Sequence, residues 1–194
     1  DLVLQSEREL GAAGSVGIGT PGSLSRINGR LRNSNSVCLN GQSILQDLEA
    51  LLGRRVRIAN DANCFALSEA TDGAAIGAKV VFGIILGTGA GAGIVVRGDL
   101  LDGPNGITGE WGHNPLPWPQ PWELPGPPCY CGKCGCIETF VSGPALANDH
   151  RLSTGAALQA DAIVAHAGNG DPACQSTLAR YEDRLARALA QIIN

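Results

Sequence analysis

The sequence predicts an α/β fold into which a proline- and cysteine-rich loop is inserted. Two observations predict the α/β class: β-branched runs alternate with segments of helical apolar spacing, and polar residues directly follow one predicted strand. A third predicts the loop, since seven of the eleven prolines lie between Pro115 and Pro128, where no helix or central strand can run. We expect Trp118 and Trp122 to pack this loop against the protein.

The N-terminal residues predict a helix followed by a strand and a tight turn. Residues 1–10 have helical propensity, and residues 15–19 predict a short buried strand that ends at Thr20-Pro21-Gly22. Gly22 suits a turn that needs a positive φ. Alternatively, this glycine lets the backbone approach a ligand.

The next segment predicts a helix, a strand and a second helix. Residues 43–46 fit a capping box, and Gly53 ends the helix that they open. Residues 55–58 alternate as a half-buried strand does, and Asn60 and Asp61 follow at its carboxyl end, where active groups of α/β folds cluster. Either residue could instead be the N-cap of the following helix. The apolar face of that helix is expected to be Ala62, Phe65, Ala66 and Ala70.

A glycine-rich segment separates two further β-branched runs. Residues 80–86 predict a buried strand, residues 94–96 predict another, and residues 87–93 predict the hairpin turn between them. Successive glycine amides can bind a phosphate, and Thr88 adds a hydroxyl donor. The alternatives are a turn that merely tolerates glycine and a dinucleotide-binding fingerprint. The fingerprint fits poorly, because β-branched residues rather than a helix start follow it.

Helices are expected after the loop. Residues 140–145 begin a short helix, residues 155–167 form another, and Asp171 with Pro172 predicts the N-terminus of a last helix. The apolar stripe of the last helix is Leu178, Tyr181, Leu185, Leu189 and Ile192. His150 and His166 have no partner pattern, so we expect them on the surface or in packing.

Four thiols and one imidazole are concentrated in the inserted loop. The thiols belong to Cys129, Cys131, Cys134 and Cys136, and the imidazole belongs to His113. Zinc takes four such ligands in a tetrahedron, so one of the five is surplus. A disulfide framework is the alternative, but cysteines at this spacing suit a shared ion better.

Composition argues against several classes of protein. A net charge of −4 without a long Lys/Arg cluster speaks against a nucleic-acid partner. The apolar run over residues 80–96 is broken by glycines and cannot be a transmembrane helix, so no membrane partner is expected. Seven cysteines, four of them grouped as metal ligands, suggest a reducing compartment. We therefore expect a cytoplasmic location.

Two motifs carry a resemblance to a known family: Glu110-x-Gly112-His113, and Cys129-x-Cys131-Gly132-x-x-Gly135-Cys136-x-Glu138. Together they resemble the signature of the ROK family, which holds bacterial sugar kinases and sugar-responsive repressors. The resemblance implies a structural Zn²⁺ held by His113, Cys129, Cys131 and Cys136, with Cys134 as an extra thiol. It also implies an α/β, ribonuclease-H-like (actin-like ATPase) sugar kinase fold with the zinc loop inserted.

The resemblance also implies roles for site residues. Asp61 matches the catalytic base, and Gly87, Thr88 and Gly89 match a phosphate loop that contacts ATP, with Mg²⁺ as cofactor. The residues expected to bind the sugar are Gly22, Asn60, Asp61, Glu110, His113 and Glu138. One imidazole nitrogen of His113 would face the metal, and the other would be free for the sugar.

The substrate expected from local resemblance is a hexose. Residues 33–36, 39–41 and 110–117 look most like bacterial fructokinases that also accept mannose. The alternatives are N-acetylglucosamine kinase, glucokinase, a sugar-sensing repressor of the same family, or a zinc-stabilised binding module without catalysis. Asp61 and the intact Gly87-Thr88-Gly89 turn favour a kinase.

The chain lacks methionine and begins at Asp1, which indicates a fragment. Residues 1–97 would be the remainder of an N-terminal domain, and residues 98–194 would hold the zinc loop and first helices of a C-terminal domain. We expect a homodimer when complete, and no sugar phosphorylation by the fragment alone.

Overall fold

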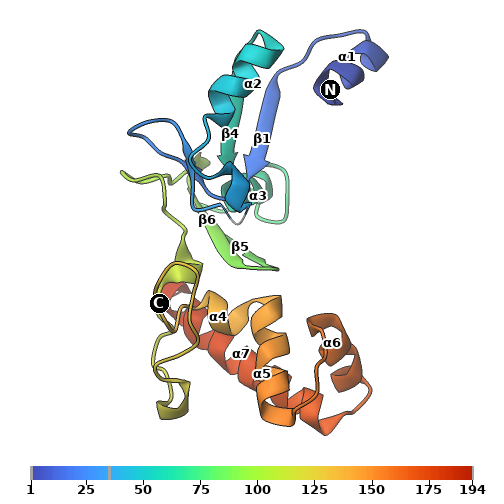
Figure 1. The fold of residues 1–194 in the computed structure, drawn as a ribbon, viewed down its shortest axis with the longest axis vertical. Helices are drawn as coiled ribbons and strands as arrows, with labels where there is room; N and C mark the ends of the chain where they lie inside the picture. Colours follow the sequence, from blue (N-terminus) through green and yellow to red (C-terminus); the bar gives the residue numbers. More distant parts are fainter. Residues whose placement is uncertain (1, 35, 194) are drawn as a thin grey trace. The chain divides into compact units, whose positions relative to one another are not determined.

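The computed structural model describes residues 2–34 and 36–193, which form two units (Figure 1). The first unit comprises Asp1–Gly83 and Gly93–Thr108, and the second comprises Ile84–Ala92 and Gly109–Asn194. Asn35, one of the residues behind the fructokinase resemblance, lies outside the described residues. The expected division after residue 97 stays a prediction.

A parallel pair of strands organises the first unit. Strand β1 (Val16–Thr20) pairs with β4 (Val56–Asn60), so that Thr20 lies opposite Asn60 at the carboxyl ends. Helix α1 (Leu2–Leu10) precedes β1, and α2 (Ile44–Leu52) packs beside β4 (Figure 1). A short antiparallel pair lies between them in sequence, formed by β2 (Ser23–Leu24) and β3 (Leu31–Arg32). The predicted helices and strands within residues 2–19 and 43–58 are confirmed, except that β1 alternates between half-buried and exposed residues and is not the buried strand that was expected.

The start of α2 differs from the prediction, whereas its end agrees. Ser43 precedes the helix with ψ at 48° and its side chain makes no capping hydrogen bond. An N-cap side chain reaches the first-turn amides from extended backbone, which this ψ is not, so the capping box does not form. Gly53 ends the helix in the left-handed region at φ 65°, and its N–H donates to the Glu49 carbonyl.

Helix α3 (Asp61–Thr71) begins where β4 ends. Ala62 and Ala66 are buried as predicted, but Phe65 is 38% exposed, so the predicted apolar face is wrong at that residue. Small residues of the neighbouring strands explain why the helix face is built from alanines. A Cβ on Gly83 or on Gly93 would lie 2.8 or 2.7 Å from the Ala66 Cβ, so only glycine permits this close packing.

The remaining strands form a sheet of order β5-β6-β7, from β5 (Val80–Leu86), β6 (Ala90–Val96) and β7 (Asp99–Leu100). The predicted turn over residues 87–93 is too long, because β6 already begins at Ala90. Glycines in this strand provide room for packing rather than flexibility for a turn, as Gly93 shows. The turn itself consists of Gly87–Gly89, closed by a hydrogen bond from the Gly87 amide to the Gly89 carbonyl.

Four helices follow in the second unit: α4 (Glu138–Val141), α5 (Gly143–Thr154), α6 (Ala160–Gly168) and α7 (Pro172–Ile193) (Figure 1). Ser142 caps α5 by accepting from the Ala145 amide, and Asp171 caps α7 by accepting from the Cys174 amide. The last three helices share a core of Leu146, Ile163, Ala167 and Cys174. The helix predicted from residue 155 begins only at Ala160, because Gly155 at φ 80° ends α5.

The two histidines of these helices lie as expected, one in packing and one on the surface. His150 is buried and its Nδ1 lies 3.0 Å from the Thr177 hydroxyl, whereas His166 is exposed. The described residues also include the 3-10 turns η1 (Val37–Leu39), η2 (Trp111–His113) and η3 (Pro121–Glu123). Among the described residues, no helix is both long enough and apolar enough to cross a bilayer.

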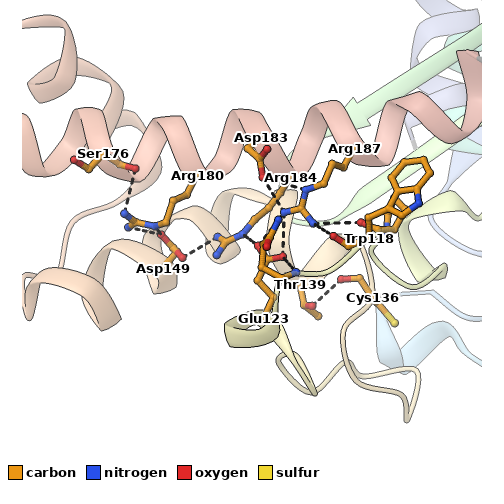
Figure 2. A network of polar contacts seen from close by, with 12 residues as sticks. Trp118, Glu123, Cys136, Thr139, Asp149, Ser176, Arg180, Asp183, Arg184 and Arg187 are labelled. Atoms are coloured by element: carbon orange, nitrogen blue, oxygen red, sulfur yellow. Dashed lines mark hydrogen bonds and ion pairs between the residues drawn. The ribbon is translucent and has the colours of Figure 1, made fainter.

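A buried ion-pair network fixes the inserted loop to the helices (Figure 2). The Glu123 side chain is 3% exposed and accepts from Arg184 Nε at 2.7 Å and from Arg187 Nη2 at 3.0 Å. Asp149 on α5 accepts from Arg184 and from Arg180. Burial would raise the pKa of Glu123, but the hydrogen bonds from Arg187 and Arg184 outweigh it, so this pKa lies below its usual value.

The tryptophans do not perform the packing role predicted for them. Trp118 and Trp122 are 63% and 76% exposed. Trp118 has φ at 46°, a left-handed conformation uncommon outside glycine. Its carbonyl, rather than its ring, holds the loop, because that oxygen accepts from Arg187 Nη1 at 2.9 Å (Figure 2).

Candidate functional site

A cluster of three thiols and one imidazole lies in the second unit. The ligand atoms of His113, Cys129, Cys131 and Cys136 all lie within 4.8 Å of one another. Cys129 Sγ is 3.5 Å from His113 Nδ1, and Cys131 Sγ is 3.6 Å from Cys136 Sγ. Zinc with bonds of 2.0–2.3 Å to such ligands needs tetrahedron edges of roughly 3.5–3.8 Å. The donor set therefore fits Zn²⁺ in its chemistry, and the two spacings of 3.5 and 3.6 Å match the edges of such a tetrahedron.

Turns rather than regular elements bring the three thiols together. The Gly132 amide donates to the Cys129 carbonyl, the Cys129 amide donates to the Lys133 carbonyl, and Gly132 has φ at 88°. Isolated bridges pair Pro128 with Cys134 and Pro115 with Cys136. The second of these bridges brings Cys136 beside the chain that follows His113.

Cys134 lies outside this group of ligand atoms and is exposed. Of the five candidate ligands, the geometry thus leaves out the same thiol as the resemblance does, and the ligand set itself stays a prediction. Burial, followed by the neighbouring thiols of Cys131 and Cys129, raises the pKa of the Cys136 thiol to about 12. A bound cation would reverse this effect, since it stabilises the thiolate form.

The second nitrogen of His113 is not free, contrary to the expectation. His113 Nε2 lies 2.9 Å from the Tyr130 hydroxyl, and the two rings meet edge to face with centroids 5.0 Å apart. Tyr130 orients the imidazole so that Nδ1 faces the thiols. Sequence reasoning missed this residue, although its place between two candidate ligands was a usable signal. A sugar hydroxyl that contacts Nε2 has to compete with Tyr130.

In the first unit the structure brings Gly22, Asn60 and Asp61 together. Asn60 is the N-cap of α3, because its Oδ1 accepts from the Asn63 amide at 3.2 Å. Its Nδ2 donates to the Gly22 carbonyl at 3.1 Å. The capping alternative is thus confirmed for Asn60, and Asp61 follows as the first residue of the helix. Sugar binding by Asn60 and catalysis by Asp61 stay predictions.

Backbone packing accounts for the glycine at position 22. Gly22 has φ at 81°, and an added Cβ would overlap the carbonyl oxygen of Arg32. The turn explanation therefore suffices, and a role over the sugar stays a prediction. Asn63, which the sequence reasoning passed over, is buried, and its Oδ1 lacks a hydrogen-bond partner within residues 2–34 and 36–193.

The other predicted residues gather around Ala90 in the second unit. Glu138 Oε2 accepts from the Ala90 amide at 2.9 Å and lies beside Gly89. Gly112 packs against the Ala90 carbonyl so closely that a Cβ there would overlap it. The segment around Glu110 and His113 and the turn Gly87–Gly89 therefore meet at one residue. A hydroxyl donor at Thr88 and the turn amides could bind phosphate there.

The chain is similar to known proteins along its whole length. An N-acetyl-D-glucosamine kinase of Pectobacterium atrosepticum is 40% identical over 197 residues, which cover all of this chain and 65% of that protein. The crystal structure of a ROK hexokinase from Thermus thermophilus has a TM-score of 0.83 and 32% identity over 98% of this chain and 62% of that one. A ROK family transcriptional regulator, a homolog of the E. coli MLC protein, has a TM-score of 0.78 and 26% identity over 100% of this chain and 52% of that one.

These similarities define an α/β fold that a hexokinase and a transcriptional regulator share. The sequence profile of the ROK family matches residues 1–194, and the chain belongs to the ROK family. The chain spans about 65% of the length of the curated relatives that it matches. The resemblance inferred from the two motifs is thus confirmed at the level of the family.

Proposed function

We propose that this chain is part of an ATP-dependent sugar kinase whose preferred acceptor is N-acetyl-D-glucosamine. The observation that carries the proposal is 40% identity along the entire chain to an N-acetyl-D-glucosamine kinase. The fructose and mannose preference rested on short loops, of which Asn35 lies outside the described residues, and the relatives do not support it. N-acetyl-D-glucosamine was one of the alternatives left open by the sequence.

The chemistry of the proposal follows from the residues. Phosphoryl transfer needs an oriented hydroxyl, a base that accepts its proton, and donors around the phosphates. Asp61 would accept the proton of the sugar hydroxyl. In the turn of Gly87, Thr88 and Gly89, the Gly87 amide donates to the Gly89 carbonyl, so the Thr88 and Gly89 amides and the Thr88 hydroxyl would donate to the ATP phosphates. Mg²⁺ would partly neutralise the charge of these phosphates when bound. The residues that would bind the other sugar groups are Gly22, Asn60, Glu110, His113 and Glu138.

A Zn²⁺ bound by His113, Cys129, Cys131 and Cys136 would have a structural role, because all four coordination positions are filled by protein atoms. It would join the segment that contains Glu110 and His113 to the segment that contains Glu138. This organisation would leave Cys134 free of the ion.

A panel of sugars tests the substrate. The longest product of the gene would be assayed for ATP-dependent phosphorylation of N-acetyl-D-glucosamine, glucose, fructose and mannose, beside the 194-residue chain, which is expected to be inactive alone. We expect kcat/KM for N-acetyl-D-glucosamine to exceed the others by at least about tenfold, because a site that hydrogen-bonds an acetamido group rejects sugars that lack it. Equal or better use of fructose would overturn the assignment.

A sugar-sensing regulator is the second candidate, favoured by the likeness to the MLC homolog. The fold does not separate the two functions, since kinase and regulator structures both superpose on the chain. Sugar binding without any ATP-dependent turnover, combined with binding to DNA, would favour the regulator.

A further inference from the structure

The segment Glu138–Gly143 holds the turn Gly87–Gly89 from both of its ends. On one side, Glu138 Oε2 accepts from the Ala90 amide at 2.9 Å. On the other side, the Gly143 amide donates to the Gly87 carbonyl at 2.8 Å. Both bonds lie within the second unit, and residues 138–142 form α4 and the cap of α5. The segment therefore fixes the position of the turn, and we call residues 138–143 the clamp.

The clamp depends on close approach at two glycines. A Cβ on Gly89 would lie 2.5 Å from Glu138 Oε2, which is closer than non-bonded atoms approach. A Cβ on Gly143 would lie 3.3 Å from the Gly87 carbonyl oxygen, so the turn would have to shift by a few tenths of an ångström. Neither Gly89 nor Gly143 has a left-handed backbone conformation. Lack of space, rather than an unusual φ, is what favours glycine at both positions.

The clamp is anchored at the Cys/His cluster. Cys136 lies two residues before Glu138, and Ile137 between them is fully buried, with its amide donating to the Asn114 carbonyl at 2.9 Å. The Ser142 amide donates to the Glu138 carbonyl at 3.1 Å, which closes α4. Displacement at the cluster is therefore transmitted along a short, hydrogen-bonded segment to the turn.

We infer that this clamp sets the affinity for the nucleotide, with Gly143 as a positioning residue and Glu138 as the link between sugar and nucleotide. The inference rests on the proposed function, because it takes the turn as the phosphate site. A carboxylate has two oxygens, so Glu138 can hold the Ala90 amide through Oε2 while Oε1 contacts a sugar hydroxyl. Amide donors that bind phosphate must be held within a few tenths of an ångström for full effect.

Replacement of Gly143 by alanine tests the inference without altering any predicted sugar ligand. In the longest active product of the gene, Gly143→Ala should raise KM for MgATP by about fivefold and leave KM for the sugar within about twofold, as a sub-ångström displacement implies. Gly168→Ala is the matched control, because an added Cβ there meets no atom within 4 Å. An unchanged KM for MgATP in Gly143→Ala would overturn the inference.

A second measurement needs neither sugar nor turnover. In the 194-residue chain, Glu138→Asp shortens the side chain by one methylene, and amide hydrogen exchange at Ala90 should accelerate by at least about tenfold as its acceptor withdraws. Glu182→Asp, at an exposed carboxylate of α7, is the control and should leave Ala90 unchanged. Unchanged exchange at Ala90 in Glu138→Asp would refute the clamp. A wild-type protein without kinase activity would instead refute the proposed function and leave this exchange test to decide the clamp.

Discussion

Asn60 joins two segments of the first unit through one amide group. Its Oδ1 caps α3 and its Nδ2 holds the carbonyl of Gly22, so the helix start and the Pro-Gly turn are fixed relative to each other. Asp61 is the next residue and shares this fixed position. The capping role of Asn60 therefore does not compete with a functional site, because the same bonds order the residues around Asp61.

Replacement of Asp61 by asparagine tests the base. In the longest active product of the gene, Asp61→Asn should lower kcat by at least about a hundredfold, the usual minimum contribution of a general base. Loss of a carboxylate in the first turn should cost only about 0.5 kcal/mol of folding free energy. Asp72→Asn, at an exposed carboxylate that follows the same helix, is the control for both measurements. Turnover of Asp61→Asn near the wild-type rate would exclude the base role.

The metal ligands give a second prediction at this scale. Elemental analysis should find one zinc per chain in wild type and in Cys134→Ser, and none in Cys129→Ser. The reason is that Cys129, unlike Cys134, belongs to the group of four ligand atoms. Cys134 is a suitable control, since it lies in the same loop and carries the same functional group. Zinc loss from Cys134→Ser with retention in Cys129→Ser would reverse the ligand assignment.

At the level of elements, the inserted loop is held by charge rather than by aromatic packing. Glu123 in η3 contacts Arg184 and Arg187, which lie more than sixty positions later in α7 (Figure 2). No local sequence pattern predicts ion pairs between residues so far apart in the chain. This is why Trp118 and Trp122 were expected to hold the loop. The caps at Gly53 and Asp171 were predictable, because their hydrogen bonds are local.

The buried ion pairs of Glu123 with Arg184 and Arg187 make the free energy of unfolding depend on pH. The pKa of Glu123 lies below its usual value of 4.5 in the folded protein, so its ionised form stabilises the fold above pH 4.5. That contribution is lost as pH falls through the folded pKa. Glu123→Gln should therefore lower the free energy of unfolding at pH 7 by about 3 kcal/mol, because two arginines lose their carboxylate partner.

Denaturant unfolding of wild type and Glu123→Gln between pH 7 and pH 3 would check this prediction. The difference between the two proteins should be constant above pH 4.5 and shrink below it. Glu182→Gln replaces an exposed carboxylate on α7, the helix that carries Arg184 and Arg187, and should show a small difference at every pH. A difference for Glu123→Gln that stays constant to pH 3 would contradict the role of ionisation.

At the scale of the whole molecule, sequence reasoning predicted the family and most element types, whereas the expected division into domains after residue 97 stays a prediction. The turn Gly87–Gly89 belongs to the second unit although the chain on either side of it belongs to the first. The membership of the turn in the second unit depends on contacts between residues distant in sequence, including those of Glu138 and Gly143 with the turn. The motifs around Glu110 and Cys129 were recognisable because their residue types stand at short, fixed spacing in the sequence.

This division predicts that removal of zinc acts on one unit only. The cluster lies entirely in the second unit, so chelation should accelerate amide exchange in residues 113–138 and at Ala90, which the clamp ties to Cys136 through Glu138. Amides of β1 and α3 belong to the first unit and should keep their protection, because none of their residues belongs to the cluster that would hold the ion. Exchange measured by mass spectrometry before and after chelation, with zinc added back, would follow both units in one sample. Equal loss of protection in both units would show that the ion stabilises the chain as a single cooperative structure, contrary to this prediction.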